Sequence, residues 1–420
     1  MKRKKTSCQP QMGAYKHFLN DMYGALHMVN VLGNFSDLSN EFKRTAYNYK
    51  IGIFNPTAGN KMITSGEIKL FAEKLKKQYR ERVHKMGSNF LSNYQIQLLY
   101  AYSSARLIEI GKQIGDKKHP EVVAVKQTKD LFFETFFTQL YLCFFKEVTR
   151  LSSPDRKYYG AYIRLAPLYK KMPKLEFFSD LFGFHSQNCL ISINGQKRPA
   201  YRLAKPVLLL ETPIIWLTVD VSLLGNFYHG NKKTLDVYIQ SHALARLKER
   251  LDLLDQEAIN YALWENTNDI KQFVNYHGYL LLPFKVFGIK TGYLIANVAD
   301  DKLLFRTFLF ITHNTSPEGD RLRKLSGLGK EDITYWKIDR LSTFVKLYEE
   351  KYPGLIQLFR KAGLETLFEL KNKEFTIDSM QDANLDGLLE YINRGKNEFK
   401  LMNLSLDTLV SEIDVEALAE

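Results

Sequence analysis

The chain has 420 residues, of which 45% are hydrophobic and 25% are charged, and its formal net charge is +13. This composition is typical of a globular protein with two or three domains and excludes a disordered chain. The longest apolar run, 206–218, is interrupted by Glu211 and Pro213. Because a membrane helix needs roughly 18 consecutive apolar residues, we expect no membrane partner.

The cysteines and the N-terminal residues indicate the compartment. Cys8, Cys143 and Cys189 are widely spaced, form no CxxC pair and are odd in number. The basic N-terminal residues MKRKK are followed by no apolar segment, so they do not resemble a secretory signal. We therefore expect reduced cysteines in a cytoplasmic protein.

Charge is distributed unevenly along the chain. The first 90 residues are rich in lysine and arginine, whereas acidic residues outnumber basic ones from Glu365 onward. A basic surface favours a polyanion such as RNA or DNA, and ordinary solvated faces are the alternative. The acidic end carries leucine-bearing helices expected at 383–392 and 404–418, which could dock on the body of the protein or on another chain as a protein partner.

Residues 1–183 are predicted to form a basic, mainly helical domain. Apolar residues recur at helical spacing in Ile68–His84, whose lysines and arginines lie mostly on the other side, and again in Tyr94–Ile114. The segment Asp130–Val148 is rich in phenylalanine and leucine and has few charges, which predicts a buried helix.

Tyrosines and basic residues are interleaved in the last part of this domain. Lys157, Tyr159 and Arg164 are the residues of this stretch that we expect to bind nucleic acid. Single strands are bound by stacking bases on aromatic rings and by pairing phosphates with cations. The alternative is a packed tyrosine surface with lysine stems lying along it.

The pattern changes from helical to extended after Gly183. Short apolar runs between turn residues predict strands in the region 184–233, and Asn194-Gly195 predicts a two-residue hairpin turn. We therefore expect a hairpin region between the helical domain and the centre of the chain.

A small α+β module is predicted at 234–315. The strand Leu235–Gln240 leads into a helix that we expect Ser241 to cap, and Asp255 is expected to cap a second short helix. Three strands joined by short turns follow, which predicts an antiparallel meander.

The region 316–420 returns to a helical pattern and is acidic towards its end. The expected fold class is therefore α+β, with a helical N-terminal domain, a central antiparallel-sheet module and a helical C-terminal region.

The first helix of the module has two different faces. Leucines at helical spacing form one face, which we expect to be buried. His242, Arg246 and Arg250 stand at i, i+4 and i+8 and form a stripe on another face. The stripe either grips phosphate groups or is an ordinary solvated surface, in which His242 bonds to a nearby loop.

The segment Val237–Arg250, VYIQSHALARLKER, and the strand ending in FRTFLFITHN resemble RelE-like ribonuclease toxins, especially the BrnT-type branch. The resemblance spans Leu235–Asn314. It implies metal-free RNA cleavage, in which the 2′-hydroxyl attacks the adjacent phosphorus. Protein groups would move the protons and stabilise the charged transition state.

The resemblance also implies roles for individual residues. His242 matches the helix histidine and is the expected base or acid. Arg246 and Arg250 match the basic stripe and are expected to grip the phosphate, which guanidinium groups bind through paired hydrogen bonds.

The last strand is expected to supply a polar group to the same site. Thr307, Thr312 and His313 lie where the family tends to place one, and we take Thr312 as the catalytic candidate. Strand alternation puts Arg306, which we expect to bind nucleic acid, on the face of Thr312 and opposite Thr307. Only one of the two threonines can therefore face the helix stripe.

Other motifs with chemistry are missing from the sequence. It contains no GxxxxGK[ST] phosphate loop, no HExxH and no CxxC, so we expect no metal and no cofactor. The leading hypothesis is a nucleic-acid-directed protein with an embedded RelE-like module, acting as a ribonuclease or as an inactive binder. The alternative is a non-catalytic structural or assembly protein of a mobile element or phage.

Overall fold

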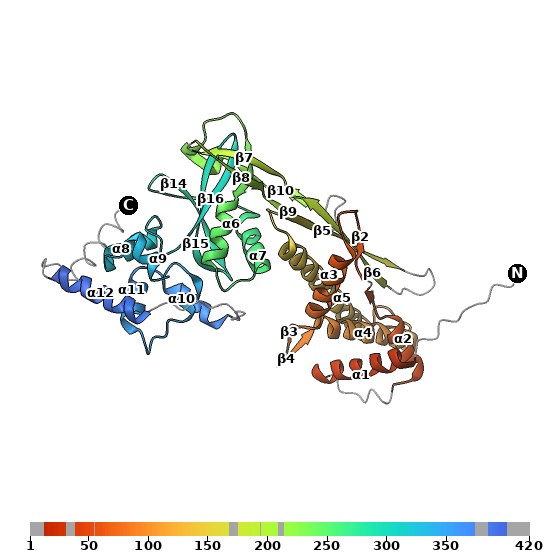
Figure 1. Ribbon diagram of the computed structural model, residues 1–420. Helices are drawn as coiled ribbons and strands as arrows, with labels where there is room; N and C mark the ends of the chain where they lie inside the picture. The colour runs from red at the N-terminus through yellow and green to blue at the C-terminus, as the bar shows by residue number, and fades with distance from the viewer. Residues whose placement is uncertain are drawn as a thin grey trace. The chain divides into compact units, whose positions relative to one another are not determined.

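The computed structural model describes residues 12–30, 38–53, 55–167, 175–193, 195–208, 214–373 and 385–400. The chain divides into two compact units. Unit 1 draws on Met1–Val148, Tyr159–Phe184 and Pro206–Ile214, and unit 2 on Thr149–Tyr158, His185–Lys205 and Ile215–Glu420. Both units combine helices with strands (Figure 1), so the predicted α+β class is confirmed.

Unit 1 is built mainly from helices. They are α1 (Met12–Met28), α2 (Asn40–Asn48), α3 (Ser65–Arg80), α4 (Asn93–Ile114) and α5 (Pro120–Leu151). Helices α1 and α2 both pack against α4. The core of this unit is aromatic, and its largest fully buried side chains include Phe18, Phe71, Phe136, Phe144 and Phe177.

Local hydrogen bonds fix the ends of two of these helices. Thr64 and Glu67 form a capping box at the start of α3, and Ser92 and Gln95 form another at the start of α4. Helix α4 ends at Gly115, whose φ of 71° suits a residue without a Cβ. The predicted helix Tyr94–Ile114 is therefore confirmed, because its start and stop signals are both local.

Helix α5 is longer than predicted and only one of its faces is buried. Phe132, Phe136 and Phe144 are enclosed, whereas Leu131 is 58% exposed and Leu142 is 47% exposed. The expectation of a fully buried helix is therefore wrong for the outer face. The high apolar content of the segment concealed an amphipathic arrangement.

After α5, extended structure resumes at Lys157, well before the predicted change at Gly183. Strand β5 (Lys157–Pro167) pairs with β6 (Leu175–His185), which also pairs in parallel with β1 (Gly52–Ile53) and β2 (Thr57–Ala58). Along β6 the buried Phe177, Ser179 and Leu181 alternate with more exposed neighbours. This two-residue period is that of a strand, so the change from helical to extended structure comes before the predicted Gly183.

Four further strands form two separate two-stranded sheets. Strand β3 (Arg82–Met86) pairs with β4 (Asn89–Ser92) as a hairpin between α3 and α4. Strand β9 (Ala204–Pro206) pairs with β10 (Ile214–Trp216).

Unit 2 contains a sheet of eight strands in the order β13-β14-β15-β16-β12-β8-β7, with β11 also paired to β12. The strands are β7 (Asn188–Ile193), β8 (Gln196–Arg202), β11 (Thr218–Asp220), β12 (Thr234–Gln240), β13 (Val274–Tyr276), β14 (Tyr279–Val286), β15 (Ile289–Ala299) and β16 (Lys302–Phe310). The predicted meander is confirmed, since β14, β15 and β16 pair antiparallel in sequence order.

The predicted hairpin is also confirmed, with Ile193 of β7 opposite Gln196 of β8. Its second strand, β8, pairs antiparallel with β12, and β12 pairs in parallel with β16. The hairpin and the central module therefore share one sheet.

Helices of unit 2 lie partly between its strands in the chain and partly after the last strand, β16. They are η2 (Val221–Phe227), α6 (Ser241–Arg250), α7 (Gln256–Thr267), α8 (Pro317–Ser326), α9 (Lys330–Tyr335), α10 (Leu341–Val345), α11 (Pro353–Lys361), η3 (Glu365–Asn372) and α12 (Leu385–Lys400). Asp255 caps α7 as predicted, by accepting a hydrogen bond from the N–H of Ala258 at 2.7 Å. The cap of α6 is Gln240, one residue before the predicted Ser241. The predicted helix at 404–418 lies outside the described residues.

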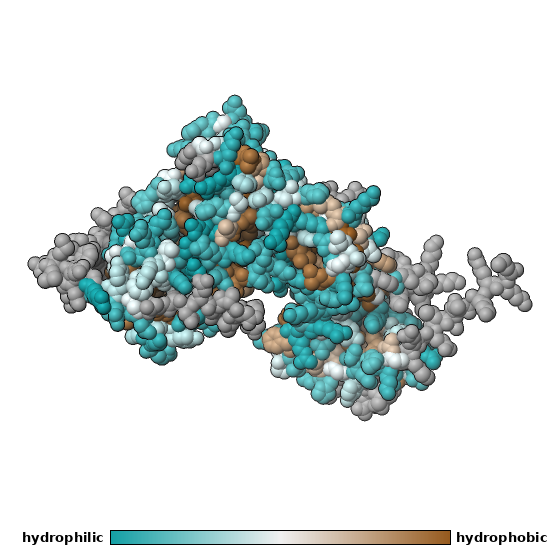
Figure 2. Space-filling view, in the orientation of Figure 1, coloured by the Kyte–Doolittle hydropathy of each residue, from teal (hydrophilic) through white to brown (hydrophobic). Residues whose placement is uncertain are grey.

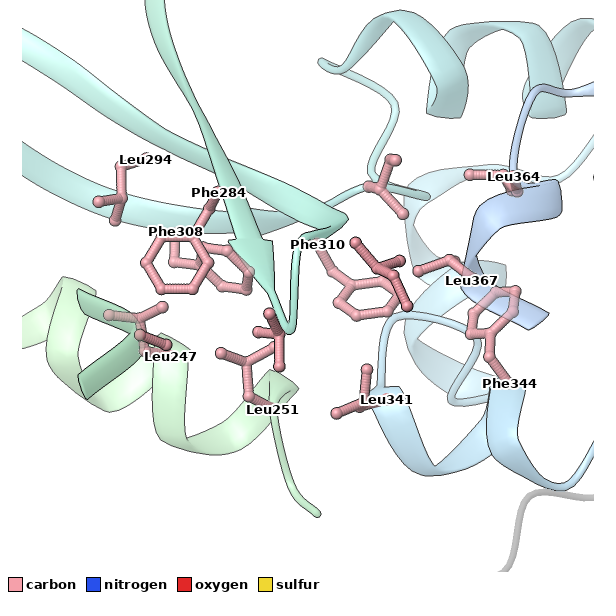
Figure 3. Packing of buried hydrophobic residues seen from close by; sticks show 14 of the residues in the cluster. Leu247, Leu251, Phe284, Leu294, Phe308, Phe310, Leu341, Phe344, Leu364 and Leu367 are labelled. Carbon is pink, nitrogen blue, oxygen red and sulfur yellow. The ribbon is translucent and has the colours of Figure 1, made fainter. Parts of the chain in front are cut away.

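One apolar core contains residues of the sheet of unit 2, of α6 and α7, and of the helices that follow Asn314 in the sequence. Figure 3 shows Leu247 of α6 and Leu251, the residue after this helix, on the side of α6 that faces Phe308 of β16. At the end of β16, Phe310 packs on Phe344 of α10, with ring centroids 5.8 Å apart. The helices after Ser316 therefore contribute to the same apolar core as α6.

Hydrophilic residues cover most of the visible face of each unit, and the apolar patches between them are small (Figure 2). Within the described ranges, none of the helices combines the length and the apolar character that crossing a membrane requires.

Candidate nucleic-acid interface

The start of α6 lies between two arginines from neighbouring strands. At the end of β12, Gln240 is opposite Ala200 of β8, and Ile239 is beside Phe305 of β16. Arg198 lies on β8 two residues before Ala200, and Arg306 is the residue after Phe305. The sheet therefore brings two guanidinium groups to the end of β12, where α6 begins.

Arg306 is the extra residue of a β-bulge. Ile295 of β15 pairs with Thr307, but the next residue, Ala296, pairs with Phe305, so Arg306 has no partner on β15. The bulge explains why Phe305 and Phe308 both face the helix-covered core although three positions separate them. Bulges of this kind commonly redirect a side chain next to a functional site.

His242 is the centre of the charged group. It is half-buried in the first turn of α6. Burial lowers its pKa, and the nearby charges of Arg246, Arg198 and Arg306 lower it further, against the opposing effect of Glu249. We call these four basic residues, His242, Arg198, Arg246 and Arg306, the His242 cluster. Its histidine is neutral at pH 7, and its positive charge belongs to the arginines.

The predicted stripe along α6 divides into two parts. Arg246 is 38% exposed and its Nη1 is 2.5 Å from a carboxylate oxygen of Glu249. Arg250 is only 11% exposed and is ion-paired with Asp339, while its Nη2 is 3.6 Å from Glu249. The structure thus keeps His242 and Arg246 at the surface but commits Arg250 to a buried ion pair.

Neither threonine presents its hydroxyl to the cluster. Thr312 is fully buried, and its hydroxyl donates a hydrogen bond to the backbone oxygen of Ile338 at 2.9 Å. Thr307 alternates with Phe308, which belongs to the helix-covered core, so it lies on the other face of the sheet. The site residues expected from the last strand are therefore reduced to Arg306.

His313, just beyond the last strand, is partly buried beside the same helix. Burial, together with the charges of Lys330, Arg250 and Arg246, lowers its pKa to about 4. Its Nδ1 accepts a hydrogen bond from the N–H of Thr315 at 3.3 Å. The ring of His313 therefore lies near the charged groups of Lys330, Arg250 and Arg246.

The other predicted nucleic-acid residues do not join the cluster. Lys157 and Tyr159 are half-buried, and the Tyr159 hydroxyl donates to Glu67 at 2.5 Å. Arg164 is 56% exposed, lies 3.7 Å from Asp180 and stacks 5.6 Å from the ring centroid of Phe178. Arg164 is therefore the one of these three whose charge remains mostly at the surface.

Sequence reasoning missed Arg198. It stands in a hairpin strand far from His242 in the sequence, and only the pairing of β8 with β12 brings the two together. The only local signal is that Lys197 and Arg198 are two adjacent basic residues beside the hairpin turn. That signal does not indicate that Arg198 lies near His242.

Among the described residues, no group of three or more His, Cys, Asp or Glu side chains is arranged to hold a metal ion. The side chains gathered at the His242 cluster are three guanidinium groups and one imidazole of lowered pKa, with the Glu249 carboxylate beside Arg246. No family model matches the chain, and neither the curated proteins nor the solved structures include a match to it.

Proposed function

We propose that unit 2 binds the phosphate backbone of RNA through the His242 cluster. The observation that carries this proposal is the convergence of Arg198, Arg246 and Arg306, from three different elements, around His242 at the start of α6. Guanidinium groups bind phosphate oxygens through paired hydrogen bonds, and placing several together costs electrostatic energy that an anion relieves.

RNA is the partner that the resemblance of Val237–Arg250 to RelE-like proteins favours. Binding is better supported than cleavage. Cleavage needs one group to remove a proton and another to protonate the leaving oxygen. A neutral His242 suits the first role, but the Thr312 hydroxyl is committed to Ile338. Arg250 is committed to Asp339.

The test compares two variants of the full chain that lose the same charge. Arg246→Gln/Arg306→Gln changes the cluster, and Arg323→Gln/Lys324→Gln changes two exposed residues of α8. Affinity for a fluorescent single-stranded RNA is measured by anisotropy from about 50 to 200 mM salt. We expect the cluster variant to bind more weakly by roughly 100-fold or more, since two lost charged hydrogen bonds at about 1.5 kcal/mol or more each cost at least about 3 kcal/mol.

The control variant should bind within about twofold of the wild type, and the wild-type affinity should fall steeply with salt as counterions are released. Equal losses in the two variants, or an affinity independent of salt, would refute the proposal. Gel analysis of the same RNA in EDTA adds a second readout. If the wild type cleaves the RNA and the His242→Gln variant does not, the protein is a catalyst as well as a binder.

A further inference from the structure

Unit 1 carries a second basic surface, on the outer face of α3. The inner face of this helix buries Phe71 and Leu75. Lys69, Lys76 and Arg80 stand at i, i+7 and i+11, which aligns them along one stripe on the exposed part of the helix. All three are exposed, so α3 presents a row of cations to solvent.

The β3–β4 hairpin continues this surface. It follows α3 after the single residue Glu81, and Figure 1 shows the hairpin at the end of α3. Its turn contains Gly87, whose φ of 60° favours glycine in a two-residue hairpin connection. The exposed Arg82 and Lys85 of β3 add two cations beyond the end of the helix.

Side-chain hydrogen bonds hold the helix and the hairpin on one body. The Tyr79 hydroxyl at the end of α3 donates to Gln97 of α4 at 2.5 Å. The Asn89 amide of β4 donates to the backbone oxygen of Met28 in α1 at 2.7 Å. Because both elements are anchored to packed helices, their basic residues keep a fixed relative position.

The cations of this surface are available to an external anion. They are Lys69, Lys76, Lys77, Arg80, Arg82 and Lys85, and none of the six forms an ion pair with any residue that the structure describes. Glu73 and Glu81 are the acidic residues among them. The excess of positive charge suits a polyanion of regular shape.

We propose that α3 and the β3–β4 hairpin bind duplex DNA. A helix of 16 residues is about 24 Å long, and the major groove of B-form DNA, about 12 Å wide, admits it. With the helix along the groove, the hairpin at its end reaches the flanking phosphates. Duplex RNA does not fit this arrangement, because its major groove is deep and narrow.

This surface is distinct from the His242 cluster, which belongs to unit 2. The inference therefore stands without the proposed RNA binding. It gives the chain a second partner, so that one protein would contact duplex DNA through unit 1 and RNA through unit 2.

The experiment measures the affinity of the full chain for a duplex DNA of about two helical turns. Two variants test the surface, Lys76→Gln/Arg80→Gln on the helix and Arg82→Gln/Lys85→Gln on the hairpin. The matched control is Lys117→Gln/Lys118→Gln, which removes two exposed lysines between α4 and α5 of the same unit. Circular dichroism checks that all variants keep the helical content of the wild type.

We expect each test variant to lose at least about tenfold in affinity near 100 mM salt. Each should also reduce the slope of log affinity against log salt by about two, one for each lost phosphate contact. The control should stay within about twofold. An equal loss in the control, or equally tight binding of duplex RNA or of phosphatidylserine vesicles, would overturn the proposal.

The same variants separate this inference from the proposed function. Arg246→Gln/Arg306→Gln should leave affinity for duplex DNA unchanged, and Lys76→Gln/Arg80→Gln should leave affinity for single-stranded RNA unchanged. If RNA binding fails while duplex DNA binding depends on α3, only the proposed function is lost. If each variant lowers the affinity for duplex DNA and for single-stranded RNA by the same factor, the assignment of duplex DNA to unit 1 is lost.

Discussion

Arg250 and Asp339 form an ion pair that is almost shielded from water, with side chains 11% and 6% exposed. Asp339 immediately precedes the segment that leads into α10, so the pair ties α6 to the C-terminal helices. Burial raises the pKa of Asp339, although Arg250 and Arg340 oppose this effect. The pair therefore fixes one helix against others and leaves Arg250 unavailable to a ligand.

Removing one member of this pair should destabilise unit 2. Asp339→Ala leaves Arg250 as a buried cation, with only the more distant Glu249 nearby, and we expect a loss of about 3 kcal/mol in unfolding free energy. Urea unfolding followed by tryptophan fluorescence measures it, because all three tryptophans, Trp216, Trp264 and Trp336, belong to unit 2.

The double variant Arg250→Met/Asp339→Leu is the control for this prediction. Replacing both charges by apolar groups of similar size removes the desolvation cost as well as the attraction. We expect its stability to lie closer to the wild type than to Asp339→Ala. A double variant less stable than the single one would show that the ion pair is itself strongly stabilising.

Unit 2 should lose stability in mild acid through His313. The folded-state pKa is about 4, below the ordinary value of 6.5, so the unfolded chain binds the proton more readily. The contribution of His313 is present above pH 6.5 and is lost as the pH falls towards 4, amounting to at most about 3 kcal/mol. Urea midpoints between these pH values should fall less in His313→Gln than in the wild type. Parallel curves would contradict the prediction.

The leucine face of α6 should dominate the packing of this helix on the sheet. Leu247 is fully buried against the core that contains Phe308, so Leu247→Ala should lower stability by about 2–5 kcal/mol. Leu190→Ala is the matched control, because the same atoms are removed from a side chain that is 66% exposed. Its effect on the free energy of unfolding should stay within about 0.5 kcal/mol. If both variants lost similar stability, the packing of α6 on the sheet through Leu247 would be contradicted.

The bulge at Arg306 predicts unequal effects of two deletions. Deleting Arg306 closes the bulge and keeps Phe305 and Phe308 on the helix-covered face, so unit 2 should still fold. Deleting Leu309 shifts the strand by one residue and turns Phe310 away from the core, which should cost more than about 4 kcal/mol. Tryptophan fluorescence distinguishes the two outcomes. If the variant that lacks Arg306 failed to fold, this result would argue against the bulge.

Several features could be predicted from the sequence because their signals are local. Helix α4 ends at Gly115, Asp255 caps α7, and β7 turns into β8 around Gly195. In each case the determining residues lie within a few positions of one another, and backbone geometry and hydrogen bonding explain the choice. The antiparallel meander follows for the same reason, since short turns join its strands.

The candidate site required the tertiary structure. The sequence identified His242, Arg246 and Arg306, but it could not determine that β8 pairs with β12, which brings Arg198 to His242. It also placed Arg250 on the same stripe as Arg246. Helical periodicity shows which residues share a face, but it does not show which distant segment covers part of that face.

The sequence by itself thus determined the α+β class, most elements of the central module and the basic character of α3 and α6. The tertiary structure alone decided that β5 and β6 are strands, that Arg306 lies in a bulge and that Asp339 covers Arg250. These features depend on pairing and burial between residues far apart in the chain. Their free energies come from desolvation and from strand register, neither of which a local pattern specifies.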